Sequence, residues 1–161
     1  MVGAGVGGLI ASRCLQDHGI DVTLFDKSQG VGGRMATRRE AGLAFDHGAQ
    51  YFTARDTRFT RYVRSWIQQG LVEPWMGQIV KLKSDGVSEG QFGTPRYVAV
   101  PGMNSLAEHL AEDLEVRTNT GISKMDSIDG KWRLIDTAGK QAGTFDWVIL
   151  NCPPKQTLKI I

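Results

Sequence analysis

The sequence predicts an α/β fold that combines a parallel sheet with flanking helices, an antiparallel β-meander and part of a mixed α+β domain. The chain opens with a glycine-rich turn that leads through residues 9–15 into a short apolar strand. Residues 122–145 hold three short strand patterns joined by turn residues, which is typical of a meander. Residues 147–150 are a continuous apolar run, which is typical of a buried parallel strand.

The first elements follow from local signals. Residues 9–15 predict a helix that Gly19 closes, because glycine is common just beyond helix ends. Residues 22–25 then predict a strand of apolar and β-branched residues that stops at Asp26. The order turn, helix, strand implies a strand before the turn, and we expect Met1 and Val2 to be all that the chain holds of it.

The middle of the chain predicts a hairpin and an amphipathic helix. Residues 38–46 can pair around Glu40-Ala41-Gly42, and Asp56 is an N-cap signal for a helix over 57–69. One face of this helix is apolar, and we expect it to be buried: Phe59, Tyr62, Val63, Trp66 and Ile67. The basic residues around the same helix indicate a solvated face: Arg55, Arg58, Arg61 and Arg64.

The remaining elements alternate short strands with one helix. Residues 78–100 predict short strands with glycine-rich turns such as Asp85-Gly86. A second helix is predicted over 105–114, with leucines on one face. The meander strands are expected at 122–128, 132–136 and 141–145, with turns at Asp129-Gly130 and Ala138-Gly139.

Composition excludes several classes of partner. A net charge of +2 gives no electrostatic reason to expect nucleic acid. No apolar run reaches the roughly 20 residues that cross a bilayer, and no signal peptide is recognisable, so we expect no membrane partner. Cys14 and Cys152 match no metal or redox spacing, which predicts no metal site and fits a reducing cytoplasm. The 20 glycines are unusual, since average usage predicts about eleven.

The excess glycine gathers in a motif. Gly3-Ala4-Gly5-Val6-Gly7-Gly8 fits GxGxxG, in which Gly3 permits a tight turn, Gly5 lets the backbone approach a pyrophosphate and Gly8 lets helix and strand pack closely. The helix that follows offers free N–H groups and a partial positive charge to phosphates. The motif alone is weak, because glycine-rich turns are common.

An acidic residue strengthens the motif. Asp26 lies at the end of the next strand, 18 positions after Gly8, where a carboxylate can accept hydrogen bonds from ribose hydroxyls. The alternative is a capping or turn aspartate. An acid at this place also argues against a 2′-phosphate on the bound nucleotide.

A second glycine segment distinguishes FAD from NAD. Gly32-Gly33-Arg34-Met35 follows Asp26 closely, and its free backbone N–H groups and guanidinium suit the far side of a pyrophosphate that continues into a flavin. A nicotinamide-dependent Rossmann dehydrogenase, the alternative enzyme, has no evident need for this loop.

These residues resemble the FAD-dependent amine oxidase superfamily. The segments Asp46-His47-Gly48-Ala49-Gln50-Tyr51-Phe52 and Pro101-Gly102-Met103-Asn104-Ser105-Leu106 are similar to its renalase-like branch, as is the stretch 147–156. The similarity spans essentially the whole chain. It implies an FAD-binding domain, incomplete, over 1–51 and 101–161, with 52–100 as part of an inserted substrate domain.

The resemblance also implies which residues bind FAD. The ADP half would be held by Gly3, Gly5, Gly8 and Asp26 with Lys27, and the pyrophosphate and ribityl region by Gly32, Gly33, Arg34 and Met35. His47, Gly48 and Ala49 would lie near the flavin, and Ile122 would present backbone to the adenine. His47 is a tempting acid/base residue, but flavin chemistry needs little such help, so a loop-orienting role is favoured and the catalytic residues stay unknown.

The implied activity is that of an FAD-dependent oxidoreductase. A dihydronicotinamide or amine-type small molecule would give a hydride to the flavin, and dioxygen would accept the electrons. Family members are considerably longer than this chain, so we expect it to be truncated at both ends, with activity of these residues alone in doubt. A non-catalytic nucleotide-binding remnant therefore remains open as a different class of function.

Overall fold

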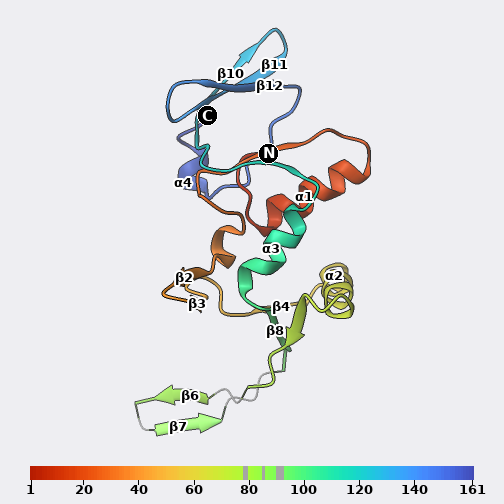
Figure 1. The fold of residues 1–161 in the computed structure, drawn as a ribbon, viewed down its shortest axis with the longest axis vertical. Helices are drawn as coiled ribbons and strands as arrows, with labels where there is room; N and C mark the ends of the chain where they lie inside the picture. The colour runs from red at the N-terminus through yellow and green to blue at the C-terminus, as the bar shows by residue number, and fades with distance from the viewer. Residues whose placement is uncertain (78–79, 85, 90–92) are drawn as a thin grey trace. The chain divides into compact units, whose positions relative to one another are not determined.

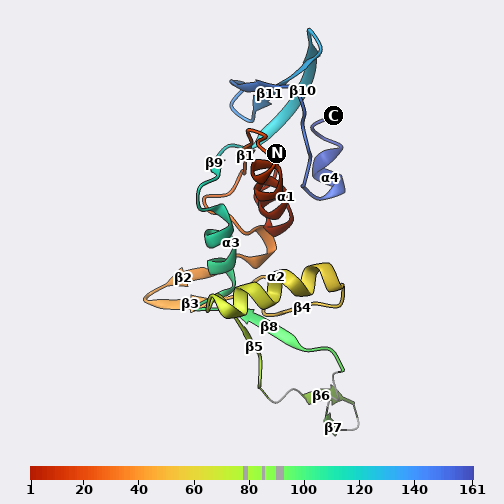
Figure 2. The same cartoon turned by 90° about the vertical axis from the view of Figure 1, so that its right-hand side faces the viewer.

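The protein's structure is a computed structural model that describes residues 1–77, 80–84, 86–89 and 93–161 (Figures 1 and 2). The chain forms two compact units. The first unit contains residues 1–36 and 107–161, and the second contains residues 37–106. Whether the units correspond to the predicted FAD-binding and substrate domains stays a prediction. Within the described residues, no helix is both long and apolar enough to cross a bilayer.

The first unit contains a parallel sheet. Strand β1 (Thr23–Phe25) pairs in parallel with β9 (Glu115–Arg117), which the sequence reading missed. Val2 bridges Phe25 on one side and Leu150 on the other, both in parallel. Its N–H donates to the Ile149 carbonyl at 2.9 Å, and only 6% of its surface is exposed. Val2 therefore lies between β1 and Leu150, where the rest of the predicted strand before the turn would lie, but it pairs through isolated bridges and forms no strand of its own.

Helix α1 (Val6–Asp17) follows the glycine turn and packs through Leu9, which is fully buried. Helix α3 (Met103–Ala111) starts and ends earlier than predicted. The Arg13 guanidinium of α1 donates to the Leu110 carbonyl in the last turn of α3 at 3.0 Å and to the Glu112 carbonyl just beyond the end of α3 at 2.6 Å. Asp113 then takes a left-handed backbone conformation with φ of 62°, so the helix cannot continue to residue 114.

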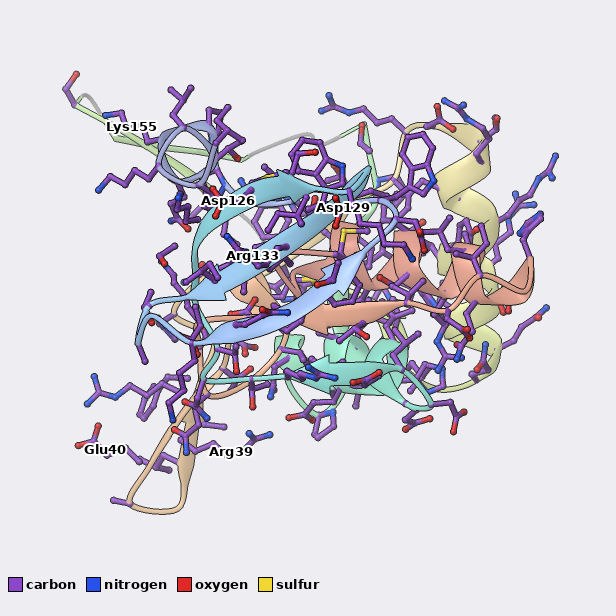
Figure 3. The ribbon with its side chains drawn as sticks, turned by 90° about the horizontal axis from the view of Figure 1, so that it is seen from above. Arg39, Glu40, Asp126, Asp129, Arg133 and Lys155 are labelled. Atoms are coloured by element: carbon purple, nitrogen blue, oxygen red, sulfur yellow. The ribbon has the colours of Figure 1, made fainter. Side chains whose placement is uncertain are left out.

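The predicted meander is confirmed as β10 (Ile122–Ile128), β11 (Lys131–Asp136) and β12 (Gln141–Phe145), paired antiparallel in that order. Asp129 and Gly130 form the first turn, with φ of 50° and 76°, as a tight hairpin between twisted strands requires. Asp126 and Arg133 face each other across β10 and β11 at 3.2 Å (Figure 3).

The meander contributes to one buried hydrophobic cluster of the first unit. The buried residues of this cluster are Val2, Phe25, Ile122, Leu134 and Ile160. Val148 and Leu150 pack against this cluster. Trp147 and Ile149, however, are 86% and 46% exposed, so the prediction of a fully buried strand at 147–150 is wrong. Only alternate side chains of the run face the core. A short helix, α4 (Pro154–Thr157), comes next.

The second unit has an antiparallel sheet in the order β4 (Phe52–Thr53), β8 (Arg96–Ala99), β5 (Val72–Pro74). Helix α2 (Thr57–Gln68) begins at Asp56, whose carboxylate accepts the Arg58 N–H as predicted. Val63 and Trp66 are buried, but Tyr62 is 43% exposed, so the predicted apolar face is wrong at that residue. The four arginines are exposed, which confirms the solvated face.

Two hairpins complete the second unit. Strands β2 (Arg38–Glu40) and β3 (Leu43–Phe45) pair around Ala41 and Gly42, which confirms the predicted hairpin. Strands β6 (Val80–Lys83) and β7 (Gly86–Glu89) pair antiparallel. Asp85 of the predicted turn at 85–86 lies outside the described residues.

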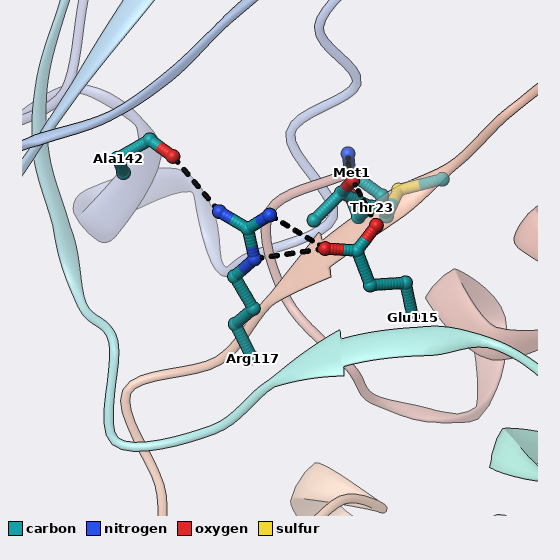
Figure 4. A network of polar contacts seen from close by, with 5 residues as sticks. All are labelled: Met1, Thr23, Glu115, Arg117 and Ala142. Atoms are coloured by element: carbon teal, nitrogen blue, oxygen red, sulfur yellow. Dashed lines mark hydrogen bonds and ion pairs between the residues drawn. The ribbon is translucent and has the colours of Figure 1, made fainter.

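A polar network ties β1, β9 and β12 together (Figure 4). The Glu115 carboxylate accepts hydrogen bonds from Arg117 at 2.6 Å and from the Thr23 hydroxyl at 3.0 Å. Arg117 also donates to the Ala142 carbonyl at 3.0 Å. The Arg117 hydrogen bonds, and then that of Thr23, hold the pKa of Glu115 below its usual value.

This network predicts a small acid-dependent contribution to stability. Because the pKa of Glu115 is lowered on folding, its contribution is present above the unfolded pKa and is lost as pH falls through the folded one. Between about pH 7 and pH 3 the Glu115→Gln variant is therefore expected to lose less of its free energy of unfolding than the wild type does. The difference should be less than about 1 kcal/mol, because the Glu115–Arg117 pair is half exposed. Urea unfolding at both pH values measures it, with Glu73→Gln on β5 as control. An unchanged acid dependence contradicts the expectation.

Candidate nucleotide-binding site

The glycine turn brings backbone rather than side chains to the edge of the parallel sheet. Gly3 adopts φ of +103°, and a Cβ there would lie 2.8 Å from the Asn151 carbonyl oxygen. Gly5 is the N-cap of α1, and it has no side chain to cap the helix. The first turn of α1 carries no acidic residue. Its backbone N–H groups and partial positive charge are therefore available to an anion.

Asp26 is fixed beside this turn. One oxygen of its carboxylate accepts the Ala4 N–H and the other accepts the Ser28 N–H, both at 2.8 Å. Its own carbonyl accepts the Thr120 N–H at 2.8 Å. Each carboxylate oxygen has further lone pairs, so Asp26 can still accept hydrogen bonds from a ligand.

The second glycine segment lies against the first. Gly32 donates its N–H to the Ala4 carbonyl at 2.9 Å, and a Cβ at Gly33 would lie 3.4 Å from the Gly5 Cα. A short 3₁₀ helix, Gly33–Met35, follows. Arg34 in this helix is exposed and forms no ion pair within the described residues. The two glycine segments therefore lie side by side, and the Arg34 guanidinium, which forms no ion pair within the described residues, comes directly after the second segment.

A cavity of about 690 Å³ opens where these segments meet. Eight of the residues predicted to bind cofactor line it: Gly3, Gly5, Asp26, Lys27, Gly32, Gly33, Arg34 and Met35. Lys27, like Arg34, has no ion-pair partner in the part of the chain that the structure describes. Two cations and exposed backbone N–H groups make this cavity suitable for an anionic ligand such as a pyrophosphate.

A second cavity of about 490 Å³ adjoins the first. Four residues line both: Gly3, Asp26, Lys27 and Gln156. The second cavity has apolar walls from Phe25, Ile122 and Ile160, and polar ones from Thr120 and Ser123. Ile122, at the start of β10, lines this cavity, and the predicted approach of its backbone to an adenine stays a prediction. Asp26 thus lies where the two cavities meet.

The other predicted residues are placed differently. Gly8 is buried and lines neither cavity, since it serves the contact between α1 and the glycine turn. His47, Gly48 and Ala49 belong to the second unit, and their place beside the flavin stays a prediction. The loop that holds them is anchored at Asp46, whose carboxylate accepts the Thr37 hydroxyl and, at 3.1 Å, the Met103 N–H.

Sequence reasoning missed one wall of the first cavity. That wall comes from residues just after the parallel run at 147–150: Asn151, Cys152, Pro153, Pro154 and Gln156. A signal was present, because ligands bind at the carboxyl ends of parallel strands and Asn151 follows such an end. The residue types at 151–156 belong to no nucleotide-binding motif, so the signal was positional only.

Comparison with known proteins agrees with this geometry. Residues 1–66 match a family described as an NAD(P)-binding Rossmann-like domain. This part of the chain is similar to that family, and it makes up less than half of the 161 residues. In the chain, 64 residues are 39% identical to a carotenoid 3,4-desaturase of Haloarcula japonica, and 48 residues are 48% identical to a 4,4′-diapophytoene desaturase of Staphylococcus haemolyticus. These matches cover 38% and 30% of the chain but only 13% and 10% of the relatives.

The fold is shared with solved oxidase structures. A triple mutant of putrescine oxidase, made to redesign its cofactor binding, superposes with a TM-score of 0.77 over 99% of the chain at 15% identity. A candidate protoporphyrinogen oxidase of Exiguobacterium gives 0.73 over 99% at 17% identity. The chain spans 58% and 60% of these two structures. At such identities the likeness establishes the fold, and the predicted Rossmann-like α/β class is confirmed.

The comparisons also bear on the predicted superfamily and cofactor. The relatives that match part of the chain are named as desaturases, and the solved structures that share its fold are named as oxidases. Membership of an FAD-dependent superfamily, and FAD as the cofactor, belong to the proposal below. The renalase-like branch is a finer assignment that these relatives do not address. The roles of individual residues toward FAD are likewise proposals.

Proposed function

We propose that this chain forms the FAD-binding part of an FAD-dependent oxidoreductase of the renalase-like kind. The observation that carries the proposal is the pair of glycine segments around one cavity, with Lys27 and Arg34 uncommitted at its wall. A mononucleotide would need only one such segment. Two segments and two cations suit a pyrophosphate that is approached from both sides.

The residues present fit the two halves of FAD. The 490 Å³ cavity, with apolar walls and Ile122 at the start of β10, would take the adenine. Asp26 at the junction would accept hydrogen bonds from the ribose hydroxyls. The 690 Å³ cavity would take the pyrophosphate, which the first-turn N–H groups of α1 and the Arg34 guanidinium would bind.

When bound, the flavin would supply two-electron chemistry, taking a hydride from a dihydronicotinamide or amine-type substrate and passing the electrons to dioxygen. The chain's own residues bind and orient the cofactor, and no side chain of the first unit is assigned a proton-transfer role. In the second unit, Asp46 would hold the His47-Gly48-Ala49 loop in shape for a place beside the flavin. We further propose a cytoplasmic location for the protein.

An absorption spectrum of the purified protein, before and after addition of FAD, tests the cofactor. We expect bands in the blue and near-ultraviolet that remain after gel filtration, because the cavities and both glycine segments are formed by the fold itself. A titration with NAD, in which binding is monitored by tryptophan fluorescence, is the control. A colourless protein that takes up NAD and excludes FAD would contradict the proposal and favour a nicotinamide-dependent dehydrogenase.

Substrate trials follow from the same preparation. Anaerobic addition of a dihydronicotinamide substrate should bleach the flavin bands, and air should restore them. A protein that holds FAD but is bleached by no dihydronicotinamide and no amine would leave the cofactor assignment intact and favour the non-catalytic nucleotide-binding remnant over an active oxidoreductase.

A further inference from the structure

Asn151 is fixed by its backbone on the glycine turn. Its N–H donates to the Val2 carbonyl at 2.8 Å, in continuation of the parallel pairing between Val2 and Leu150. On the other side, its carbonyl oxygen lies 2.8 Å from the place that a Cβ at Gly3 would occupy. The position of Asn151 is therefore set by the same strand that positions the GxGxxG turn.

The side chain of Asn151 lies over the first turn of α1. Its Oδ1 is 3.4 Å from the place of a Cβ at Gly7, and its Nδ2 is 2.8 Å from the place of a Cβ at Gly8. The glycines at 7 and 8 thus leave the space that this amide occupies. A Cβ at Gly8 would clash with the amide, and one at Gly7 would only touch it.

The amide is available to a ligand. Asn151 is exposed, and it lines the 690 Å³ cavity together with Gly5 and Arg34. Within the described residues its side chain forms no hydrogen bond, although its two N–H groups and its oxygen could form several. An asparagine that served only to cap α1 would bind the helix N–H groups, and this one does not.

We propose that Asn151 is a phosphate-binding residue of the nucleotide site, donating an Nδ2 hydrogen bond to the pyrophosphate beside the first turn of α1. The inference rests on the proposed function, and it adds a phosphate-binding side chain that is not part of the glycine motif. The amide adds an uncharged directional donor to a cavity that the Lys27 ammonium and the Arg34 guanidinium also line. It would act on the phosphates alone, because the proposed place of the adenosine is the adjoining 490 Å³ cavity, which Asn151 does not line.

Calorimetric titration of the protein with FAD, ADP and adenosine tests this role. Asn151→Ala is expected to weaken ADP and FAD by about 5–10-fold, the effect of one hydrogen bond, and to leave adenosine unchanged. Asn151→Asp keeps the shape but places a carboxylate beside the phosphates, so the loss should be on the order of 100-fold and should shrink at high salt. Asn119→Asp, the same change at a residue that lines neither cavity, is the matched control and should behave as wild type.

The possible results distinguish a phosphate-binding role of Asn151 from a structural one. Weaker ADP and FAD with unchanged adenosine supports the assignment. Equal weakening of all three ligands indicates a structural role and overturns it, as does unchanged ADP affinity in both Asn151 variants. A wild-type protein that binds neither FAD nor ADP contradicts the proposed function itself and removes the inference with it. Circular dichroism of each variant shows whether α1 and the sheet are intact.

Discussion

Gly8→Ala is expected to destabilise the protein by about 1–3 kcal/mol and to lower its FAD affinity on the order of 100-fold. A Cβ at Gly8 would collide with the Gly3 carbonyl oxygen and would lie 2.8 Å from Asn151 Nδ2. The Asn151 amide can move, but the Gly3 carbonyl cannot, because the Gly3 N–H donates a hydrogen bond to the Phe25 carbonyl in the parallel sheet. Helix α1 must therefore shift away from the turn, and its first-turn N–H groups move with it.

Alanine substitutions at two further glycines distinguish an effect on stability from an effect on FAD affinity. Gly30→Ala has open space around it and lines neither cavity, so both stability and FAD affinity should stay at wild-type values. Gly5→Ala also meets no atom within 4 Å, but Gly5 lines the 690 Å³ cavity. It should fold normally and bind FAD more weakly. Thermal unfolding and flavin titration measure both quantities, and a Gly8→Ala protein that behaves like Gly30→Ala refutes the packing argument.

The parts of the site that the sequence predicted are those that local backbone chemistry determines. A tight turn, a helix N-terminus and a close helix–strand contact need glycine at fixed spacing, and Gly3, Gly5 and Gly8 satisfy these needs within six residues. Asp26 follows at the end of the next strand for the same reason. The meander was equally predictable, because Asp129-Gly130 is a two-residue turn with alternating strands on both sides.

The parts that the sequence left out depend on contacts between distant segments. Asn151 reaches the glycine turn only because Val2 pairs with Leu150, and neither residue type predicts that pairing. The error at 147–150 has a related origin, since an apolar run does not show how many of its faces are covered. Strand β9 is short and polar, and it was recognisable only through its partner β1.

Asp26→Ala is expected to weaken FAD and ADP on the order of 100-fold and to lower stability by about 1–3 kcal/mol. The carboxylate accepts the Ala4 and Ser28 N–H groups, so alanine leaves two backbone donors without their partner. It also removes the acceptor for the ribose hydroxyls, and hydrogen bonds to a charged group are among the stronger ones. Calorimetry with ADP and urea unfolding measure the two losses separately.

Asp26→Asn removes the negative charge of the side chain and nearly keeps its shape. The amide oxygen can still accept one backbone N–H, so stability should fall less than in Asp26→Ala. A carboxylate repels a 2′-phosphate on the ribose, and Lys27, which lines both cavities beside it, attracts one. The variant should therefore narrow the preference for ADP over 2′-phospho-ADP by about tenfold or more. If the preference is unchanged while ADP binding falls, Asp26 supports the turn but does not select the nucleotide, and the selectivity must come from another wall of the junction.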